Sequence, residues 1–284
     1  MRKPAWLKSP LHVGEHFKDV TTTLQQLRLH TVGQEAACPN LGECWGRGTA
    51  TFMILGDVCT RVCRFCNVST GHPSAPDEEE PHRVAEAVKA LSLKYCVITS
   101  VTRDDLSDGG AANFAFTVKA IRSACNNTSI EVLIPDFDGN VNSLQKIIDA
   151  GPDVISHNVE TVARLTPEVR DRRTDYDRSL FVLEQIKESN PVLTTKSGFM
   201  VGLGEIEEEI LGTMQDLRNV GCDIITIGQY LQPSKECVPV IEYVHPDTFD
   251  EYRKFGEAIG FQSVASGPLV RSSYLADHYF KEVG

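Results

Sequence analysis

Short apolar runs rich in β-branched residues recur along the chain at regular intervals. They lie at 50–56, 94–101, 130–134, 153–157, 193–200 and 223–228. Runs of this length and nearly continuous apolar character are typical of strands that are buried on both faces of a parallel sheet. The pattern therefore predicts six parallel strands.

Between these runs, apolar residues recur with helical spacing. The expected helices cover 82–92, 111–124, 140–149, 159–165, 176–188 and 205–219, with a further helix at 246–259. Strands alternating with helices imply a parallel sheet with helices outside it. No GxGxxG or GxxxxGK[ST] pattern follows the first strand, so a dinucleotide-binding or P-loop fold has no support. We expect an α/β fold, a partial (β/α)6 barrel resembling the TIM barrel.

Polar or glycine-rich residues follow each predicted strand at the end where the strand stops. In chain order they are Cys59, 102–105, Asp136 and Asp138, Asn158 and Glu160, 202–205, and Gln229 with Tyr230. In barrels of this kind, the chemistry gathers beyond the carboxyl ends of the strands. The pattern thus predicts one functional site at this edge of the sheet.

Composition narrows the class of protein without identifying it. The chain has 284 residues and a net charge of −11, and 41% of its residues are apolar. It has no basic patch that would indicate nucleic-acid binding and no apolar run long enough to cross a bilayer. The basic, proline-interrupted N-terminal stretch lacks the apolar segment of a signal peptide. These features predict a cytoplasmic or organellar-matrix protein, and we take the cytoplasm as the prediction.

Cysteine is distributed unevenly, with five of the nine cysteines between positions 38 and 66. Three of them form the spacing Cys59-x3-Cys63-x2-Cys66 just after a predicted strand. Three thiolates can hold three irons of a [4Fe–4S] cluster and leave the fourth iron open for a small molecule. The alternatives are a zinc site completed from elsewhere in the chain and a redox pair of Cys63 with Cys66.

These cysteines, with Phe65 directly before the last one, resemble the CxxxCxφC motif of the radical S-adenosylmethionine superfamily. Longer stretches are similar to one family within it, the lipoyl synthases. They are ACPNLGECW (37–45), TSVTRDDLSDGGA (99–111), LIPDFDGN (133–140), HNVETV (157–162), KSGFMVGLGE (196–205), TIGQYLQPS (226–234) and GPLVRSSY (267–274).

The resemblance implies a radical reaction that inserts sulfur at C6 and C8 of a protein-bound octanoyl chain. The radical comes from S-adenosylmethionine bound at the open iron, and the sulfur comes from an auxiliary [4Fe–4S] cluster. The implied partners are octanoylated carriers, namely the glycine cleavage H protein and the acyltransferase subunits of 2-oxo acid dehydrogenases, and an electron donor such as ferredoxin or flavodoxin. The implied ligands of the auxiliary cluster are Cys38, Cys44 and Ser272, and no catalytic residue is implied beyond the clusters and S-adenosylmethionine.

Position 33 departs from the family's Cx4Cx5C pattern, because it holds glycine where the pattern has cysteine. Glycine cannot ligate iron, so we expect a poorly held auxiliary cluster and little lipoyl product. An engineered change, a sequence error and a natural loss of the ligand could each explain Gly33. The first two are favoured, because Cys38, Cys44 and Ser272 remain.

The resemblance also suggests which residues contact S-adenosylmethionine. They are Phe65, Thr102, Asp105, Asn158, Glu160, Arg173 and Lys196. The alternatives are turn and capping chemistry for Thr102, Asp105 and Asn158 and a surface position for Arg173. A buried lysine needs a partner, which favours a functional role for Lys196.

We predict three parts for the chain: a cluster-binding N-terminal extension (1–48), the barrel (49–245) and a C-terminal helical segment (246–284). Two other functions compete with lipoyl synthesis. One is a radical enzyme without sulfur insertion, which Gly33 supports, and the other is an iron–sulfur scaffold protein.

Overall fold

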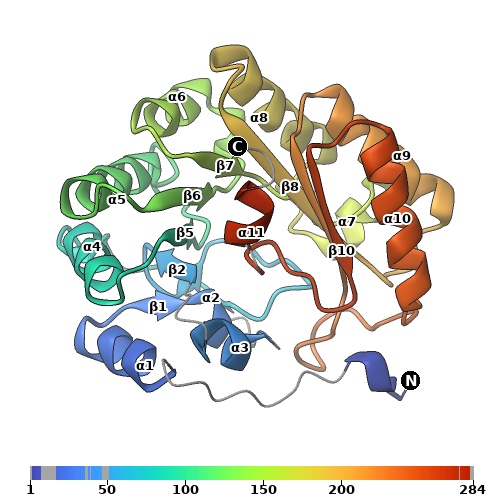
Figure 1. Cartoon of the computed structure of the whole chain (residues 1–284), viewed down its shortest axis with the longest axis horizontal. Helices are drawn as coiled ribbons and strands as arrows, with labels where there is room; N and C mark the ends of the chain where they lie inside the picture. Colours follow the sequence, from blue (N-terminus) through green and yellow to red (C-terminus); the bar gives the residue numbers. More distant parts are fainter. Residues whose placement is uncertain are drawn as a thin grey trace. The chain divides into compact units, whose positions relative to one another are not determined.

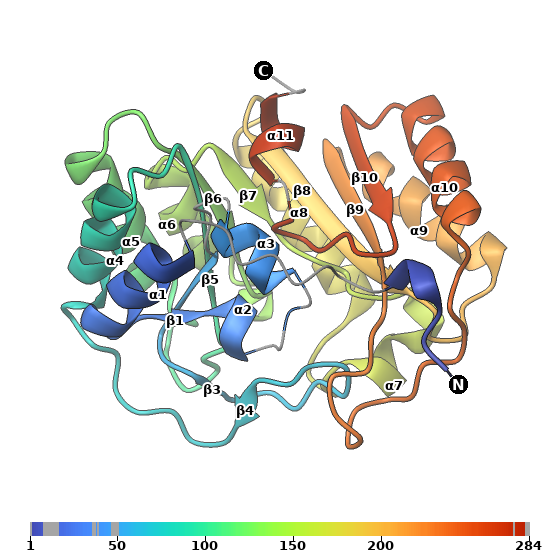
Figure 2. The same ribbon diagram turned by 60° about the horizontal axis from the view of Figure 1, so that its bottom comes forward.

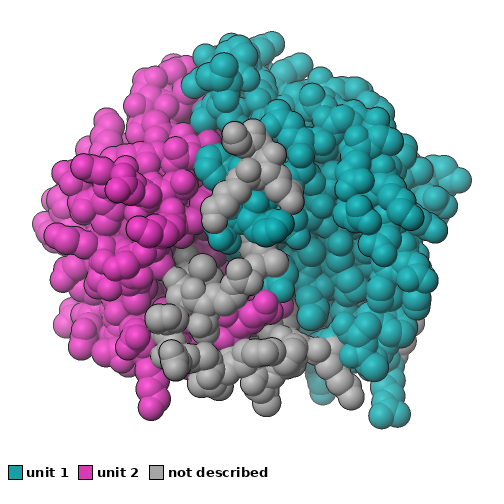
Figure 3. Space-filling model, in the orientation of Figure 1, with its two compact units in different colours: residues 1–9, 62–66, 156–284 teal, residues 10–61, 67–155 magenta. Residues whose placement is uncertain are grey.

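The chain divides into two compact units, which are coloured separately in Figure 3. Unit 1 comprises residues 1–9, 62–66 and 156–284, and unit 2 comprises 10–61 and 67–155. The structure is a computed structural model that describes residues 2–7, 17–35, 38, 40–46, 51–274 and 276–281. The predicted boundary at 48 and 49 lies outside the described residues, and the three-part division stays a prediction.

Unit 2 contains the first strands of the parallel sheet and a small second sheet. The main strands are β1 (His30–Thr31), β2 (Thr51–Ile54), β5 (Tyr95–Ser100) and β6 (Ser129–Leu133), with β7 (Val154–Ser156) at the junction of the units. β2 pairs with β5 and β5 with β6 in parallel, whereas β1 is antiparallel to β2. The second sheet is the parallel pair of β3 (Val58–Cys59) and β4 (Ser69–Thr70).

The helices of unit 2 fall into two groups. The first group precedes β2, and the second group follows the strands from β4 onward. They are α1 (Phe17–Gln26), α2 (Val32–Glu35), α3 (Leu41–Gly46), α4 (Glu80–Ala90), α5 (Ala111–Ala124), the 3-10 turn η2 (Phe137–Gly139) and α6 (Val141–Asp149). Figure 1 shows α4, α5 and α6 along the outer side of β2, β5 and β6. Asn140 caps α6, since its side chain accepts a hydrogen bond from the backbone N–H of Ser143.

The core of unit 2 forms where apolar strand residues meet the apolar faces of these helices. Ile98 on β5, Ile130 on β6 and Phe114 on α5 are fully buried. Burial of each such side chain stabilises the fold by about 1.5–3 kcal/mol. The core therefore holds the carboxyl ends of β5 and β6 in place.

Unit 1 contains the last strands and their covering helices. The strands β8 (Thr194–Val201), β9 (Ile224–Gln229) and β10 (Ser263–Gly267) are parallel neighbours in that order. The helices are η1 (Ala5–Leu7), η3 (Ala163–Leu165), α7 (Thr166–Val169), α8 (Tyr176–Ser189), α9 (Glu207–Asn219), α10 (Pro246–Ala258) and α11 (Ala276–Lys281). Figure 2 shows α9 and α10 beside β9 and β10. Their contact is a hydrophobic core that includes Ile225, Ile227, Met214 and Phe249.

All six predicted strands are confirmed, although residue 50 of the first lies outside the described residues. The sheet is mostly parallel and is not closed, as a partial barrel requires. The C-terminal segment adds a strand that we did not expect, β10, because its sequence SVASG lacks the large β-branched pattern of the others.

The single helix predicted at 159–165 is wrong. Glu160 has a φ of 67° and forms an isolated bridge with Phe199, so helical structure begins only at Ala163. Among the described residues, no helix combines the length and the apolar character needed to span a lipid bilayer.

Candidate functional site

Cys59 ends β3 and lies in unit 2 with backbone groups directed at its sulfur. Cys59 Sγ accepts hydrogen bonds from the backbone N–H of Arg61 at 3.4 Å and of Thr102 at 3.3 Å. The backbone of Thr60 also donates to the carbonyl of Thr102 at 3.0 Å. The segment after β5 therefore fixes both the backbone and the thiol of the Cys59 loop.

Cys63 and Cys66 lie in unit 1, on the short segment 62–66. Cys63 Sγ accepts a hydrogen bond from the backbone N–H of Asp171 at 3.3 Å. The Asp171 carboxylate in turn accepts from the backbone N–H of Val62 at 2.7 Å. The N–H of Cys66 donates to the carbonyl of Cys63 at 3.1 Å, which forms a tight turn between the two thiols.

The chemistry of these three thiols fits an iron–sulfur cluster. Each is a partly buried cysteine that is not part of a disulfide. Hydrogen bonds to ligand sulfurs and burial are features by which proteins tune such clusters. Two of the three thiols accept backbone N–H groups, so they suit an anionic, metal-bound sulfur.

The N-terminal cysteines are in unit 2, on and beside two short helices. Gly33 lies in α2, and its carbonyl accepts from the N–H of Cys38 at 3.1 Å. Cys44 lies in α3, and its N–H donates to the carbonyl of Asn40 at 2.9 Å. Both cysteines are partly buried and neither is part of a disulfide.

The backbone at Gly33 does not require glycine, because its φ is not among the positive values of the chain. An added Cβ would approach one atom closely, Leu41 Cδ1 at 2.7 Å, which is the end of a flexible side chain. A larger residue at position 33 therefore needs only a small movement of Leu41.

Thr102 and Asp105 follow β5, as expected, but both have partners within unit 2. Asp105 forms two hydrogen bonds of 2.8 Å with Arg103, which lower the pKa of its carboxyl. Arg103 is itself only 1% exposed and also donates to the carbonyls of Leu55 and Ser74. These contacts make Asp105 a partner of a buried arginine, and a cofactor contact of Asp105 stays a prediction.

Asn158, Glu160 and Ser272 come together in unit 1. Asn158 Nδ2 donates to Ser272 Oγ at 2.7 Å and to Glu160 Oε1 at 3.2 Å. Burial raises the pKa of Glu160, against the opposing effects of Arg170 and of the Asn158 hydrogen bond. Asn158 Oδ1 is buried and has no hydrogen-bond partner within the part of the chain that the structure describes. A ligand amine or hydroxyl could donate to this oxygen, which suits the amino and ribose groups of S-adenosylmethionine.

Arg173 and Lys196 have different surroundings, also in unit 1. Arg173 is bound to Asp171 through Nε at 2.8 Å and Nη2 at 3.1 Å, which holds the pKa of that carboxyl well below its ordinary value. Lys196 is 2% exposed on β8 and is thus buried, as expected from its strand pattern. Phe65 packs against the hydrophobic core of unit 1. The cofactor roles of all three residues stay predictions.

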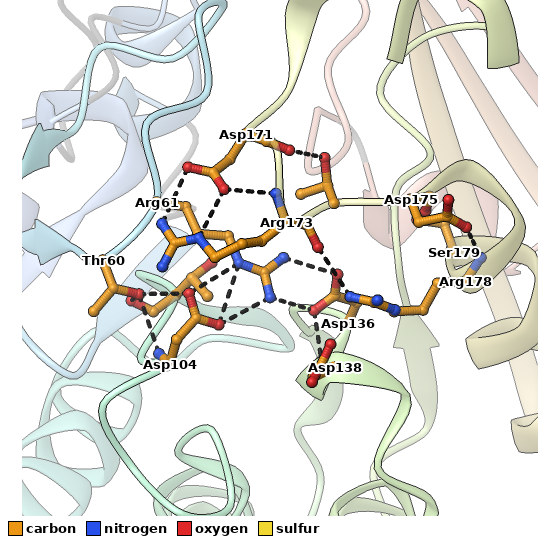
Figure 4. Close-up of polar contacts among 12 residues, drawn as sticks. Thr60, Arg61, Asp104, Asp136, Asp138, Asp171, Arg173, Asp175, Arg178 and Ser179 are labelled. Atoms are coloured by element: carbon orange, nitrogen blue, oxygen red, sulfur yellow. Dashed lines mark hydrogen bonds and ion pairs between the residues drawn. The ribbon is translucent and has the colours of Figure 1, made fainter. Parts of the chain in front are cut away.

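Arg61 had no expected role from its sequence position, yet it makes several of the polar contacts beside Cys59 in unit 2. Figure 4 shows its guanidinium between the carboxylates of Asp104 and Asp136. The available signal was an arginine between two motif cysteines together with an aspartate after each of two strands. This signal is weak by itself, because arginine is more often a surface residue.

Comparisons with known proteins agree on one family. The Radical SAM superfamily model matches residues 53–217. A protein named lipoyl synthase from Caldicellulosiruptor saccharolyticus is 54% identical over 280 residues, which cover 99% of this chain and 98% of the relative. Another of that name from Thermus thermophilus is 52% identical over 281 residues, which cover 99% of this chain and 87% of the relative.

A solved structure supports the fold independently. Methylornithine synthase superposes with a TM-score of 0.56 at 12% identity, covering 98% of this chain and 92% of that protein. At this identity the likeness concerns the fold alone.

Proposed function

The chain belongs to the lipoyl synthase family of the Radical SAM superfamily, and we propose that it carries a complete ligand set for one [4Fe–4S] cluster and an incomplete set for a second. The family acts on lipoyl-carrier proteins and inserts sulfur at C6 and C8 of an octanoyl chain that they carry. Its cofactors are [4Fe–4S] clusters and S-adenosylmethionine.

The complete set consists of Cys59, Cys63 and Cys66. These three residues would hold a cluster that, with S-adenosylmethionine, would supply the radical chemistry needed at an unactivated C–H bond. The observation that carries this assignment is the backbone N–H groups of Arg61, Thr102 and Asp171, which donate to two of the thiols. They hold these sulfurs in position and favour their anionic form.

Buried polar residues of unit 1 are the first of the proposed contacts of S-adenosylmethionine. Asn158 offers its buried, unpartnered Oδ1 atom, and Glu160 lies beside it. Lys196 is a buried cation in the same unit and would suit a carboxylate. Phe65, Thr102, Asp105 and Arg173 complete the proposed set on the family resemblance.

The incomplete set consists of Cys38, Cys44 and Ser272, with Gly33 at the first cysteine position of the Cx4Cx5C pattern. A serine oxygen is a weaker iron ligand than a thiolate, because iron–sulfur chemistry favours soft ligands. Without a thiol at position 33, we expect the auxiliary cluster to be held poorly, which leaves little sulfur for insertion and gives little lipoyl product.

The finer details of the partners come from the family resemblance. We propose octanoylated H protein and acyltransferase subunits of 2-oxo acid dehydrogenases as carriers, ferredoxin or flavodoxin as electron donor, and the cytoplasm as the compartment. The division into an extension, a barrel and a C-terminal segment belongs to the same proposal.

Replacement of Gly33 by cysteine tests the proposal directly. The original chain, Gly33→Cys and Gly33→Ala would each be reconstituted anaerobically with iron and sulfide. We expect about four irons per chain in the original and in the alanine variant and about eight in the cysteine variant. Gly33→Ala is the matched control, since it adds the Cβ against Leu41 without adding a thiol.

The products separate the two clusters. All three proteins should form 5′-deoxyadenosine with dithionite and S-adenosylmethionine, whereas only Gly33→Cys should convert an octanoyl-lysine carrier to lipoyl product in high yield. About eight irons and full turnover in the original chain would contradict the proposal. A colourless, zinc-containing protein would contradict the complete set as well.

A further inference from the structure

Arg61 lies between two of the proposed cluster ligands, Cys59 and Cys63, and is almost completely buried. It is 4% exposed, although it belongs to a polar loop. Its guanidinium forms two hydrogen bonds with Asp136, from Nη1 at 2.8 Å and from Nη2 at 2.7 Å. It donates to Asp104 as well, from Nη2 at 2.9 Å and from Nε at 3.1 Å.

These two carboxylates come from neighbouring parallel strands of unit 2. Asp104 follows β5 and Asp136 follows β6, and the strands pair in parallel up to Thr99 and Leu133. One guanidinium therefore bridges the carboxyl ends of two adjacent strands. A planar group with five donors can satisfy two carboxylates at once, whereas a lysine ammonium cannot reproduce this geometry.

The same loop is tied down at the residue before Arg61. Thr60 Oγ1 donates to the Asp104 carboxylate at 2.9 Å and accepts from the backbone N–H of Asp104 at 3.1 Å. The N–H of Arg61 is one of the two donors to Cys59 Sγ. A fixed position of the Arg61 backbone therefore also fixes this hydrogen bond to the Cys59 thiol.

The charges of Asp104 and Asp136 stabilise the buried guanidinium of Arg61. Burial by itself lowers the pKa of Arg61, but the hydrogen bonds and charges of Asp136 and Asp104 raise it above its ordinary value overall. Asp136 has a fully buried side chain, and Asp104 has a side chain that is 26% exposed. Loss of Arg61 would leave a buried carboxylate without its cation, which is strongly unfavourable.

We propose that Arg61 is a positioning residue for the cluster loop: it fixes Cys59 at the ends of β5 and β6 before any metal binds. This inference rests on the proposed role of Cys59 as a cluster ligand. It goes beyond that role by identifying the side chain that holds Cys59 in position. It also assigns Asp104 and Asp136 as the residues that hold Arg61.

The test uses Arg61→Gln, Arg61→Lys and Asp104→Asn, with Arg122→Gln as matched control. Arg122 also forms an arginine–aspartate pair in unit 2, with Asp153 at 2.5 Å, but both side chains are 32% exposed and the pair does not belong to the cluster loop. The first measurement is the alkylation rate of Cys59 in the iron-free full chain, with the modified peptide quantified by mass spectrometry. The second is the iron content and the electron paramagnetic resonance spectrum of the reduced, reconstituted protein.

In Arg61→Gln, alkylation of Cys59 should accelerate about tenfold or more, since removing one partner of a buried pair opens the loop. Arg61→Lys should not restore the original rate, and Asp104→Asn should give a smaller increase while its unfolding transition stays close to that of the original chain. The cluster spectrum should broaden in both Arg61 variants and stay unchanged in Arg122→Gln.

Three results would overturn the inference: an unchanged Cys59 rate in Arg61→Gln, full rescue by lysine, or an equal effect of Arg122→Gln. Because Arg61→Gln could destabilise the whole unit, Asp104→Asn keeps the test decisive. If the original chain binds no iron through Cys59, the proposed function fails, whereas the alkylation rates still decide whether Arg61 positions the loop.

Discussion

The two cysteine-bearing regions of this chain differ in the number of thiols that they provide. The loop at 59–66 has all three thiols, and neighbouring backbone groups donate to two of them. In the N-terminal region, Gly33 lies in α2, Cys44 lies in α3 and the N–H of Cys38 donates to the Gly33 carbonyl, but Gly33 supplies no side chain.

This difference shows that the local backbone structure and the side chain that could ligate iron are separate requirements. At Gly33, the backbone bond from Cys38 is present and φ is not in the left-handed region, so the fold around the position is compatible with an ordinary residue. One missing thiol can therefore remove a cluster ligand without removing the local structure. The loop at 59–66 has a further layer of support, because Arg61 and Asp171 hold its ends through charged hydrogen bonds.

The largest expected effect comes from replacing one cysteine by serine in each of the two regions. Cys59→Ser should remove about four irons per chain and reduce 5′-deoxyadenosine formation to background, because a complete set loses a thiolate. Cys38→Ser should change neither quantity much, because its set already lacks a ligand. Both variants would be compared by iron analysis and by product quantification after anaerobic reconstitution.

Cys222→Ser is the control, since Cys222 is a buried cysteine outside both sets, and its thiol donates to the carbonyl of Ile224 at 3.3 Å. If Cys38→Ser lost as much iron as Cys59→Ser, the N-terminal set would hold a cluster despite Gly33, and the contrast between the regions would be wrong.

The fold could be predicted from the sequence where apolar runs are long and distinctive. The six runs became β2 and β5 to β9, because buried parallel strands have a strong compositional signal. β10 could not be found in this way, since its small residues become a strand only by pairing with β9. The turn at Glu160 could not be predicted either, because the spacing of apolar residues does not indicate a positive φ at a glutamate.

Candidate site residues could be chosen from the sequence by motif, whereas the contacts between them could not. The three thiols and the strand-end polar residues were identified because their types and spacing carry chemistry. The bridging role of Arg61 was not, since it depends on Asp104 and Asp136, which are 43 and 75 residues away in sequence. The hydrogen bond between Asn158 and Ser272 could not be predicted for the same reason, since the two residues are 114 positions apart.

A smaller effect concerns the ionic support of the loop. Asp171→Asn should lower the free energy of unfolding by about 1–3 kcal/mol at neutral pH, since hydrogen bonds to a charged group are lost and an amide N–H₂ would face donors. The folded-state pKa of Asp171 is below its ordinary value, so its contribution is fully present above the unfolded pKa of about 3.9 and is lost as the pH falls further. Urea unfolding should therefore give the same deficit at about pH 7 and pH 5.5 and a smaller one near pH 3.5.

Glu184→Gln provides the comparison for this prediction, because Glu184 is an exposed carboxylate on α8 of the same unit. A deficit that was equal for the two variants, or that grew as the pH fell, would show that Asp171 gives the loop no specific support.

The smallest effect tests whether Gly33 is needed by the backbone. Gly33→Ala gains helix propensity, worth up to about 1 kcal/mol in a longer helix than α2, and it crowds Leu41 Cδ1, which lies 2.7 Å from the added Cβ. Because the two contributions oppose each other, we expect the free energy of unfolding to change by less than about 1 kcal/mol. Urea unfolding of Gly33→Ala, Leu41→Ala and the double variant forms a cycle that isolates the crowding, and the double variant should be more stable than the sum of the single changes predicts. A loss above about 2 kcal/mol in Gly33→Ala would mean that glycine is structurally required at position 33. The N-terminal region would then differ from the loop at 59–66 in its backbone as well as in its missing thiol.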